Sequence, residues 1–309
     1  MGKATRAAYG ETLIELADEG FDVVAIDADL SGSTTTAKFG AVFPERFFNA
    51  GIAEANMTDV AAGLARAGKI AFTGSFAVFG TGRAWEQVRN TVCANNLDVK
   101  LAPTHAGVTV GPDGGSHQAL EDIALMRVLP RMRVLVPADY HAAKAAVRLA
   151  ATTPGPFYIR LGRANVDEVY DAGFELELGK AYVLREGSDV TLAACGIEVA
   201  EALCAAEMLE KQDIDAEVID VASIKPLDVD TLVTSVAKTG RIVTCEEHSV
   251  LAGMGSAVSE VLSEICPTPT RRIGVADSFG LSGSPRQLVT HFKLDAASIV
   301  EAAKELYLS

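Results

Sequence analysis

Residues 98–128 read DVKLAPTHAGVTVGPDGGSHQALEDIALMRV, and this stretch decides the fold class. Residues 98–103 are a largely apolar run that ends at a proline, which is typical of a buried strand. A glycine-dense loop follows over 104–117, and residues 118–128 have the apolar spacing of a helix. Strand, loop and helix in this order form a βα unit, the building block of parallel sheets.

The same alternation extends outward from this unit in both directions. The predicted strands are nearly continuous apolar runs, as expected where helices cover both faces of a parallel sheet. In the first half we predict strands over 22–27, 69–73, 133–136 and 157–161 and helices over 7–19, 53–67, 82–95 and 140–152. In the second half we predict strands over 189–195, 215–220, 241–245 and 272–276 and helices over 196–211, 228–238, 253–265 and 295–307.

Between the two series, an acidic and glycine-containing stretch breaks the rhythm. We therefore predict an α/β protein with two doubly wound domains and mostly parallel sheets, the second domain being the smaller. The predicted first domain is 1–165, the linker is 166–187 and the second domain is 188–309.

Composition limits the partners and the compartment. The chain has 309 residues with 27 Lys and Arg against 41 Asp and Glu, a net charge of −14 that disfavours binding to nucleic acid or an anionic membrane. No apolar run approaches the roughly 20 residues that a membrane span requires. The five cysteines are widely spaced and form no C-x-x-C pair, which argues against a disulfide framework or a cysteine zinc site. We expect a cytoplasmic protein.

The loop over 104–118 contains four glycines, together with His105, Asp113 and His117. The glycines permit positive φ and close approach of the backbone to a ligand. Because the loop joins a strand to a helix, it lies where parallel α/β sheets bind their ligands. The sequence therefore predicts a binding or catalytic site here.

Two further features are ambiguous from the residues alone. Glu54 begins a helix in a stretch of small apolar residues, so it is either a partner of the helix dipole or a partly buried acid–base group. Phe76 and Phe79 follow a strand at a spacing of three and are core residues by default. The glycine pairs at 80–82 and 253–255 lack the last glycine of a dinucleotide fingerprint, and the chain has neither a phosphate loop nor an H-E-x-x-H pair.

Taken together, five segments occur in the order and spacing of transketolases. They are Asn49-Ala-Gly-Ile-Ala-Glu-Ala-Asn-Met57, Gly74-Ser-Phe76 through Phe79, the loop over 104–118, Val136-Pro-Ala-Asp139 and Tyr158-Ile-Arg-Leu-Gly-Arg163. Essentially the whole chain resembles the C-terminal portion of transketolase, with its pyrimidine-binding domain and its smaller C-terminal domain. Glu246-Glu-His248 and Gly253-Met-Gly-Ser256 are similar to segments of that last domain.

The resemblance also implies a missing half. Transketolases bind the diphosphate of thiamine diphosphate through Mg²⁺ on a preceding domain with a Gly-Asp-Gly…Asn motif, which this sequence does not contain. We therefore expect the C-terminal subunit of a split transketolase, inactive alone, with no metal ligands of its own. The partner subunit would carry the diphosphate and Mg²⁺ domain, in an α2β2 heterotetramer.

The implied activity is transfer of a two-carbon ketol unit from a ketose phosphate to an aldose phosphate, in carbohydrate metabolism such as the pentose phosphate pathway. By resemblance, the cofactor contacts are a carboxylate that binds N1′ of the aminopyrimidine (Glu54), a stacking ring (Phe79), a pocket wall (Phe76) and a nearby carboxylate (Asp29).

By the same resemblance, His117 exchanges protons with substrate oxygens and Asp113 contacts a hydroxyl of the donor sugar. The implied clamp for the sugar phosphate consists of Arg6, Ser33, His105 and Arg163. Gly82 departs from the pattern, because many transketolases carry an aromatic residue there.

Three alternatives stay open. Two are enzymes: the β subunit of a 2-oxo acid dehydrogenase E1, and an enzyme like 1-deoxyxylulose-5-phosphate synthase. The third is a degenerate scaffold or regulatory subunit. The Gly-Pro-Asp-Gly-Gly-Ser-His-Gln loop favours transketolase over the first two. Retention of Glu54, Phe79, Asp113 and His117 together argues against the third.

Overall fold

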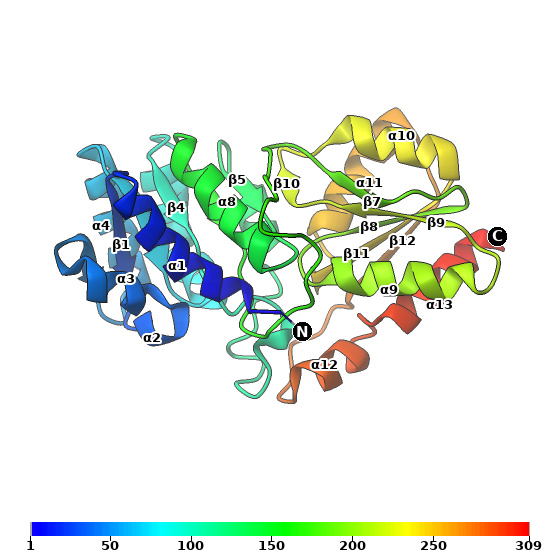
Figure 1. Ribbon diagram of the computed structural model, residues 1–309, viewed down its shortest axis with the longest axis horizontal. Coiled ribbons are helices and arrows are strands. Elements are labelled where there is room, and N and C mark those ends of the chain that lie inside the picture. The colour runs from blue at the N-terminus through cyan, green and yellow to red at the C-terminus, as the bar shows by residue number, and fades with distance from the viewer. Residues whose placement is uncertain (1, 309) are drawn as a thin grey trace.

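The computed structural model describes residues 2–308, which form two α/β lobes lying side by side (Figure 1). The first lobe contains a seven-stranded sheet and the second a five-stranded sheet. Both sheets are mostly parallel and have helices on both faces. The predicted fold class is confirmed.

The first sheet carries the candidate site at one edge. In spatial order its strands are β10 (Ser223–Lys225), β5 (Arg133–Leu135), β6 (Phe157–Ile159), β4 (Val99–Leu101), β3 (Ile70–Gly74), β1 (Val23–Asp27) and β2 (Phe47–Asn49). All pairings are parallel except that of β10 with β5. Because β10 comes from the second half of the chain, this sheet ties the two halves together.

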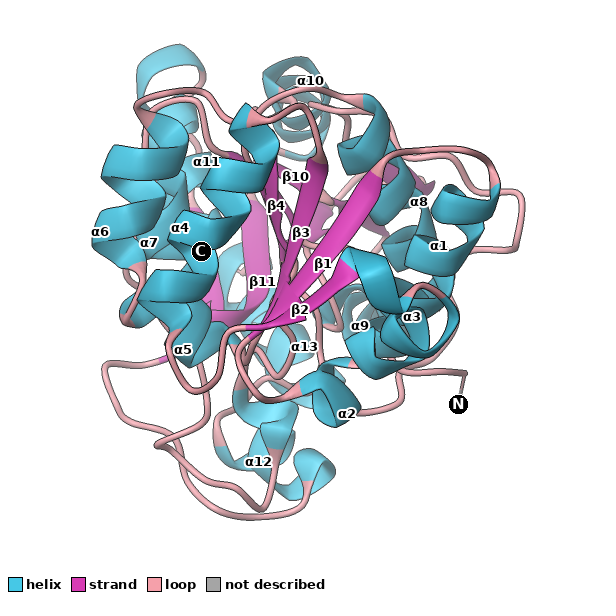
Figure 2. Cartoon of the chain, turned by 90° about the vertical axis from the view of Figure 1, so that its left-hand side faces the viewer, coloured by secondary structure: helices cyan, strands magenta, loops and turns pink. Residues whose placement is uncertain are grey.

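Alternating side chains of the strands pack against two layers of helices (Figure 2). Val23 and Ala25 of β1 join a core with α1 (Thr5–Asp18), α3 (Thr36–Val42) and α8 (Tyr140–Thr152). Val24 and Ile26 face the opposite way, as the period of two in a strand requires. The helical segments on that second face are α4 (Glu54–Arg66), α5 (Ala77–Gly82), α6 (Trp85–Gln87), a π-helical turn (Val88–Cys93) and α7 (Asp122–Arg127).

The second sheet has the same construction. Its strand order is β12 (Thr270–Val275), β11 (Ile242–Ser249), β8 (Val190–Ala194), β9 (Ala216–Asp220) and β7 (Tyr182–Arg185), with only β7 antiparallel. The helices of this lobe are α9 (Glu198–Glu210), α10 (Val229–Thr239), α11 (Met254–Ile265), α12 (Pro285–His291) and α13 (Ala296–Tyr307). The core beneath α10 and α11 is continuous with that beneath α4 and α7, so the lobes share one apolar interior.

Short segments complete the connections: α2 (Ser31–Thr34) and two 3₁₀ turns (Pro44–Arg46 and Val108–Val110). The helix predicted over 82–95 is present from Trp85 to Cys93, as α6 followed by the π-helical turn. A separate helix, α5, precedes it, and the two are divided near Ala84, whose φ of −97° and ψ of 10° leave the helical region. The predicted linker contains β7, which pairs with β9. The domain boundaries stay a prediction.

Two negative findings apply to this structure. Within residues 2–308, no helix has the length and apolar character needed to cross a bilayer. All five cysteines are free thiols.

Candidate functional site

Three neighbouring strands end at the same edge of the first sheet, and candidate residues follow each of them. Asp29 comes two residues after β1, and Phe76 two residues after β3. A parallel bridge between Phe76 and Thr104 continues the β3–β4 pairing beyond the strands and brings His105 alongside Phe76. This carboxyl edge is where open parallel sheets bind ligands.

Aromatic rings and imidazoles from separate loops form one cluster. The rings of Phe76 and His105 are stacked with their centroids 3.8 Å apart, and Phe76 stacks on Phe79 at 6.0 Å. His117 meets Phe79 edge-on at 5.4 Å and Phe76 at 6.0 Å. The structure thus brings together four of the predicted residues, two from the start of α5 and two from the glycine loop.

Glu54 is the first residue of α4, and its side chain is only 3% exposed. Nη1 of Arg83 donates to both carboxylate oxygens, at 3.1 and 3.2 Å. The same guanidinium lies over the Phe79 ring, 4.2 Å from its centroid. Glu54 thus begins a helix and is also buried, and its acid–base role stays a prediction.

The residues of the predicted anion clamp also lie near one another. Nη1 of Arg6 donates to the carbonyl oxygen of Ser33 at 2.8 Å, and Nη1 of Arg163 donates to that of Val110 at 2.8 Å. The guanidiniums are close enough that Arg163, after burial, lowers the pKa of Arg6. Two adjacent cations make this part of the site locally positive in an acidic protein.

His105 is neutral in this surrounding. Its ring is buried and Nδ1 lies 2.7 Å from the Thr104 hydroxyl. Burial, followed by repulsion from Arg6, Arg163 and His117, lowers the pKa of His105 to about 3. Its φ of 63° is in the left-handed region, a strained conformation that tends to occur at functional sites. We expect the imidazole to act as a hydrogen-bonding group and not as a cation.

Asp29 lies at the same edge, and its hydrogen bonds are with the neighbouring strand β2. Its Oδ1 accepts from Nδ2 of Asn49 at 3.1 Å, and its backbone N–H donates to Oδ1 of Asn49 at 3.2 Å. Asp27, just before it, is fully buried and accepts from the hydroxyls of Thr34 and Thr36. Asp27 therefore anchors the short helix α2, which carries Ser33.

The two remaining candidates on the glycine loop, Asp113 and His117, differ in their exposure to solvent. Asp113 is exposed, whereas His117 is half-buried. Nδ1 of His117 is 2.9 Å from the Ser116 hydroxyl, and its backbone N–H donates to the carbonyl of Gly114 at 3.0 Å. Both side chains are thus on one short loop, with His117 against the aromatic cluster.

These residues fit the aminopyrimidine part of thiamine diphosphate. Such a ring needs a buried carboxylate for N1′ and an aromatic face for stacking, and Glu54 and Phe79 provide these side by side. Among the described residues 2–308, no group of three His, Cys, Asp or Glu is placed to hold a metal ion.

Arg83 and Asp27 were missed by the sequence analysis. An arginine at the end of a glycine-rich segment is ordinarily a surface residue, and Arg83 is 53% exposed despite its contacts. For Asp27, its place at the last position of an apolar strand was the available signal.

Gly82 has no atom within 4 Å of a Cβ built on it, so the position that is aromatic in many transketolases is open space here.

Comparison with known families matches two domain models. Residues 1–168 match the transketolase pyrimidine-binding domain, and residues 179–299 match the transketolase C-terminal domain.

Individual relatives match along nearly their full length. A 6-deoxy-6-sulfo-D-fructose transketolase subunit of Clostridium sp. strain MSTE9 is 44% identical over 97% of this chain and 94% of its own. One of the subunits of an apulose-4-phosphate transketolase of Phocaeicola vulgatus is 39% identical over 98% of this chain and 97% of its own. A solved structure described as a split-gene transketolase, an inactive β4 tetramer, superimposes with a TM-score of 0.92. It is 51% identical and covers 100% of this chain and 99% of its own.

Proposed function

The chain belongs to the transketolase family, and from this premise we propose that it works as the C-terminal subunit of a split transketolase. The reaction would transfer a two-carbon ketol unit from a ketose phosphate to an aldose phosphate. The observation that carries the proposal is the buried Glu54 carboxylate, which shares the Arg83 guanidinium with the Phe79 ring at the carboxyl edge of a parallel sheet.

Thiamine diphosphate, when bound, supplies the carbon nucleophile for this reaction. In our proposal Glu54 holds a proton at N1′ of the aminopyrimidine, and Phe79 stacks on the ring with Phe76 as the adjacent wall. His117 exchanges protons with oxygens of the reacting sugar, and Asp113 accepts a hydrogen bond from a donor hydroxyl. Asp29 serves as a further carboxylate near the cofactor.

We propose that Arg6 and Arg163 bind the anionic end of the sugar, with neutral His105 and Ser33 as hydrogen-bonding partners. The sugars in the names of the two relatives carry a sulfonate in one case and a phosphate in the other. Guanidinium groups recognise either anion through the same paired hydrogen bonds. A terminal anion on a ketose is therefore the substrate feature that this cluster supports.

The binding of the metal ion and of the diphosphate is assigned to a partner subunit. We propose that Mg²⁺ and the diphosphate are held by an N-terminal subunit, and that two such subunits combine with two copies of this chain. Support comes from the names of the two relatives, each of which is one subunit of a transketolase.

The test is a coupled assay with ribose 5-phosphate as acceptor, thiamine diphosphate and Mg²⁺. Xylulose 5-phosphate, apulose 4-phosphate and 6-deoxy-6-sulfofructose are compared as donors. Each is supplied to this chain alone and to its mixture with a candidate N-terminal subunit. We expect turnover only in the mixture. Turnover of a 2-oxo acid in place of ketoses would assign the chain to a dehydrogenase, and activity from the chain alone would contradict the split.

A further inference from the structure

All four glycines in the loop over 104–118 face the second lobe. A Cβ at any of them would approach an atom of that lobe to 3.3 Å or less. The four approaches are Gly107 to the Glu247 carboxylate (2.1 Å), Gly111 to the Gly283 carbonyl (3.3 Å), Gly114 to the Ser282 hydroxyl (2.4 Å) and Gly115 to the Gly280 carbonyl (2.5 Å). The glycines are thus explained by packing between lobes, where the sequence analysis had assigned them to ligand approach.

Gln118 closes the C-terminal end of this loop. Its Nε2 donates to the carbonyl of Val108 at 3.1 Å and to that of Leu281 at 2.8 Å. Its Oε1 is buried, and a Cβ on Gly280 would lie 1.6 Å from that oxygen. One side chain therefore joins the two ends of the loop to the segment 277–283, and only glycine fits opposite it.

A second contact fixes the start of the loop. The backbone N–H of Thr109 donates to Oε1 of Glu247, on β11, at 2.6 Å. Arg160 reaches across the same junction, with Nη2 donating to the carbonyl of Glu247 at 2.8 Å and to that of Ala119 at 3.3 Å. Asp113 and His117 lie between these two fixed points.

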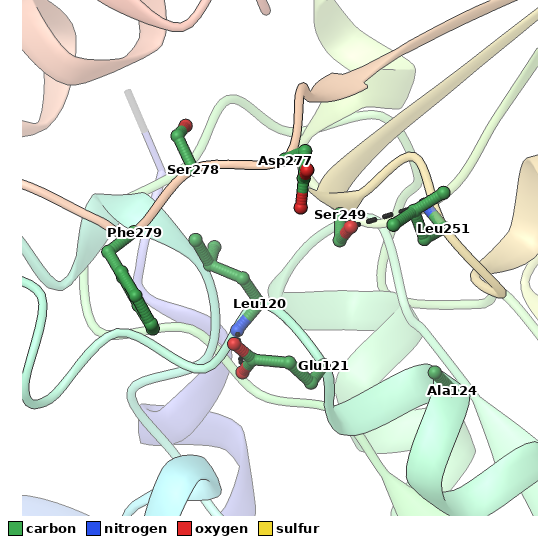
Figure 3. Close-up of a pocket in the computed structure, with 8 residues that line it drawn as sticks. All are labelled: Leu120, Glu121, Ala124, Ser249, Leu251, Asp277, Ser278 and Phe279. Atoms are coloured by element: carbon green, nitrogen blue, oxygen red, sulfur yellow. Dashed lines mark hydrogen bonds between the residues drawn. The ribbon is translucent and has the colours of Figure 1, made fainter.

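On the side away from Gln118 and the loop glycines, the segment 277–283 has few packing contacts. Phe279 is 87% exposed, and a pocket of about 340 Å³ opens beside it, lined from both lobes (Figure 3). Figure 3 shows Leu120 and Glu121 of the first lobe facing Asp277, Ser278 and Phe279 of the second. The contact with Gln118 and the loop glycines is therefore the main anchor of this segment.

We propose that the second lobe positions the loop over 104–118. Gln118 is the positioning residue, and Gly280 is the residue against which its side chain packs. The inference rests on the proposed function, since it concerns the placing of Asp113 and His117 against the donor sugar. A displacement of about 1 Å in such groups lowers kcat/KM by up to about 100-fold. The role of the second lobe would then be to hold a loop of the first in its working geometry.

The first test measures kcat and KM in the complete complex. Gln118→Met keeps the length of the side chain but removes both donated hydrogen bonds, and Gly280→Ala introduces the clash. Gly63→Ala, an exposed change on α4, is the control, because no atom lies within 4 Å of a Cβ built there. We expect kcat/KM to fall by about 10-fold or more in the first two, and to stay within about 2-fold in the control.

The second test needs no activity. In the chain labelled with ¹³C at histidine Cε1, the His117 signal is expected to shift or broaden in Gln118→Met and Gly280→Ala. The signals of His141 and His291 should stay in place. If the wild-type complex transfers no ketol unit, the proposed function fails, whereas the His117 signal still reports on positioning.

Folded variants with kcat/KM within about 2-fold of wild type would overturn the inference. So would an unmoved His117 signal, even with lowered activity, because it would indicate a merely structural effect. If Gly280→Ala does not fold, the milder Gln118→Met decides.

Discussion

At the scale of single residues, Arg83 connects two side chains that we propose to receive the aminopyrimidine. It donates to Glu54 and lies over Phe79, the two contacts that such a ring would also need. A buried carboxylate is costly without a partner. Arg83 therefore stabilises the buried carboxylate of Glu54.

We predict that Arg83→Ala lowers the free energy of unfolding of the free chain by about 1 kcal/mol. The loss should nearly vanish in the Glu54→Gln background, because a neutral amide does not require a cation. Urea unfolding of the wild type, both single variants and the double variant measures this coupling. Equal losses in both backgrounds would show that Arg83 acts by packing and not through Glu54.

Glu54→Gln is expected to lower kcat of the complete complex by about 100-fold or more, since proton transfer by a placed acid–base group contributes at least that much. Gln occupies the same volume but cannot hold the proton at N1′. Glu45→Gln, an exposed change in a 3₁₀ turn, is the matched control and should leave kcat unaltered. Near wild-type turnover in Glu54→Gln would remove this residue from the proposed chemistry.

Arg163→Ala is expected to raise KM for an anionic donor by about 10-fold with little change in kcat, because one charge-assisted hydrogen bond is worth about 1.5–3 kcal/mol. Arg66→Ala, an exposed change at the end of α4, serves as control. Because the pKa of His105 is lowered to about 3, that imidazole adds no charge to the clamp above pH 5. An unchanged KM in Arg163→Ala would exclude this side chain from the clamp.

At the scale of elements, the long strands and helices were predictable and the short ones were not. The strand predicted over 22–27 is β1 (Val23–Asp27), because a continuous apolar run buried on both faces has few alternatives. The edge strands β7 and β10 are half-polar and depend on partners far away in sequence. Helix α12 was overlooked, although Ser284, Pro285 and Gln287 form a capping box with proline at the first turn.

In the candidate site, too, some features were predictable from the sequence and others were not. The motifs located Phe76, Phe79, His105 and His117 as candidates, and the structure brings their rings into one cluster. The partner of Glu54 could not be predicted, since the exit of Arg83 from α5 depends on the helix break at Ala84. Local sequence therefore indicated which residues are candidates, while tertiary contacts decide how they are paired.

A buried carboxylate at the end of β9 gives a pH-dependent prediction. Asp220 accepts from the Tyr170 hydroxyl at 2.8 Å, but its other oxygen is buried without a partner. Burial, with a contribution from Asp139, raises the pKa of Asp220 to about 7, against which the Tyr170 bond acts. A raised carboxyl pKa means that its stabilising contribution is present below about pH 4 and is lost as pH rises through about 7.

Asp220→Asn should therefore be nearly as stable as the wild type at pH 4 and more stable at pH 8, by about 3–4 kcal/mol, since each unit of pKa shift corresponds to about 1.4 kcal/mol. Thermal unfolding at the two pH values measures the difference. Other buried carboxyls with raised pKa, such as Glu198 and Glu247, are present in both proteins and cancel. Asp59→Asn, an exposed change on α4, should show no such pH dependence. A gain in stability of Asp220→Asn that is the same at both pH values would indicate a packing effect.

At the scale of the whole molecule, the two lobes are joined by more than a linker. Strand β10 extends the first sheet, one apolar core runs beneath both, and the glycine loop packs on the segment 277–283. The lobes should therefore unfold together. The surface that they present nevertheless retains large exposed apolar side chains, among them Ile52, Val128, Leu251 and Phe279. Such side chains on a protein surface commonly mark sites of association.

We predict that this chain buries part of this exposed apolar surface against a second chain, a copy of itself when it is alone and the proposed partner subunit when that is present. Because Leu251 and Phe279 border the same pocket at the lobe junction, Phe279→Ser should weaken self-association. Leu308→Ser, a change of equal polarity at another exposed site, should not. Light scattering after size-exclusion chromatography, with and without the partner, measures the assembly, and the ketol-transfer assay measures each fraction. A monomer at micromolar concentration would contradict the prediction, because the exposed apolar side chains would then not drive association. Activity in the fraction without partner would contradict the proposed dependence on a second subunit.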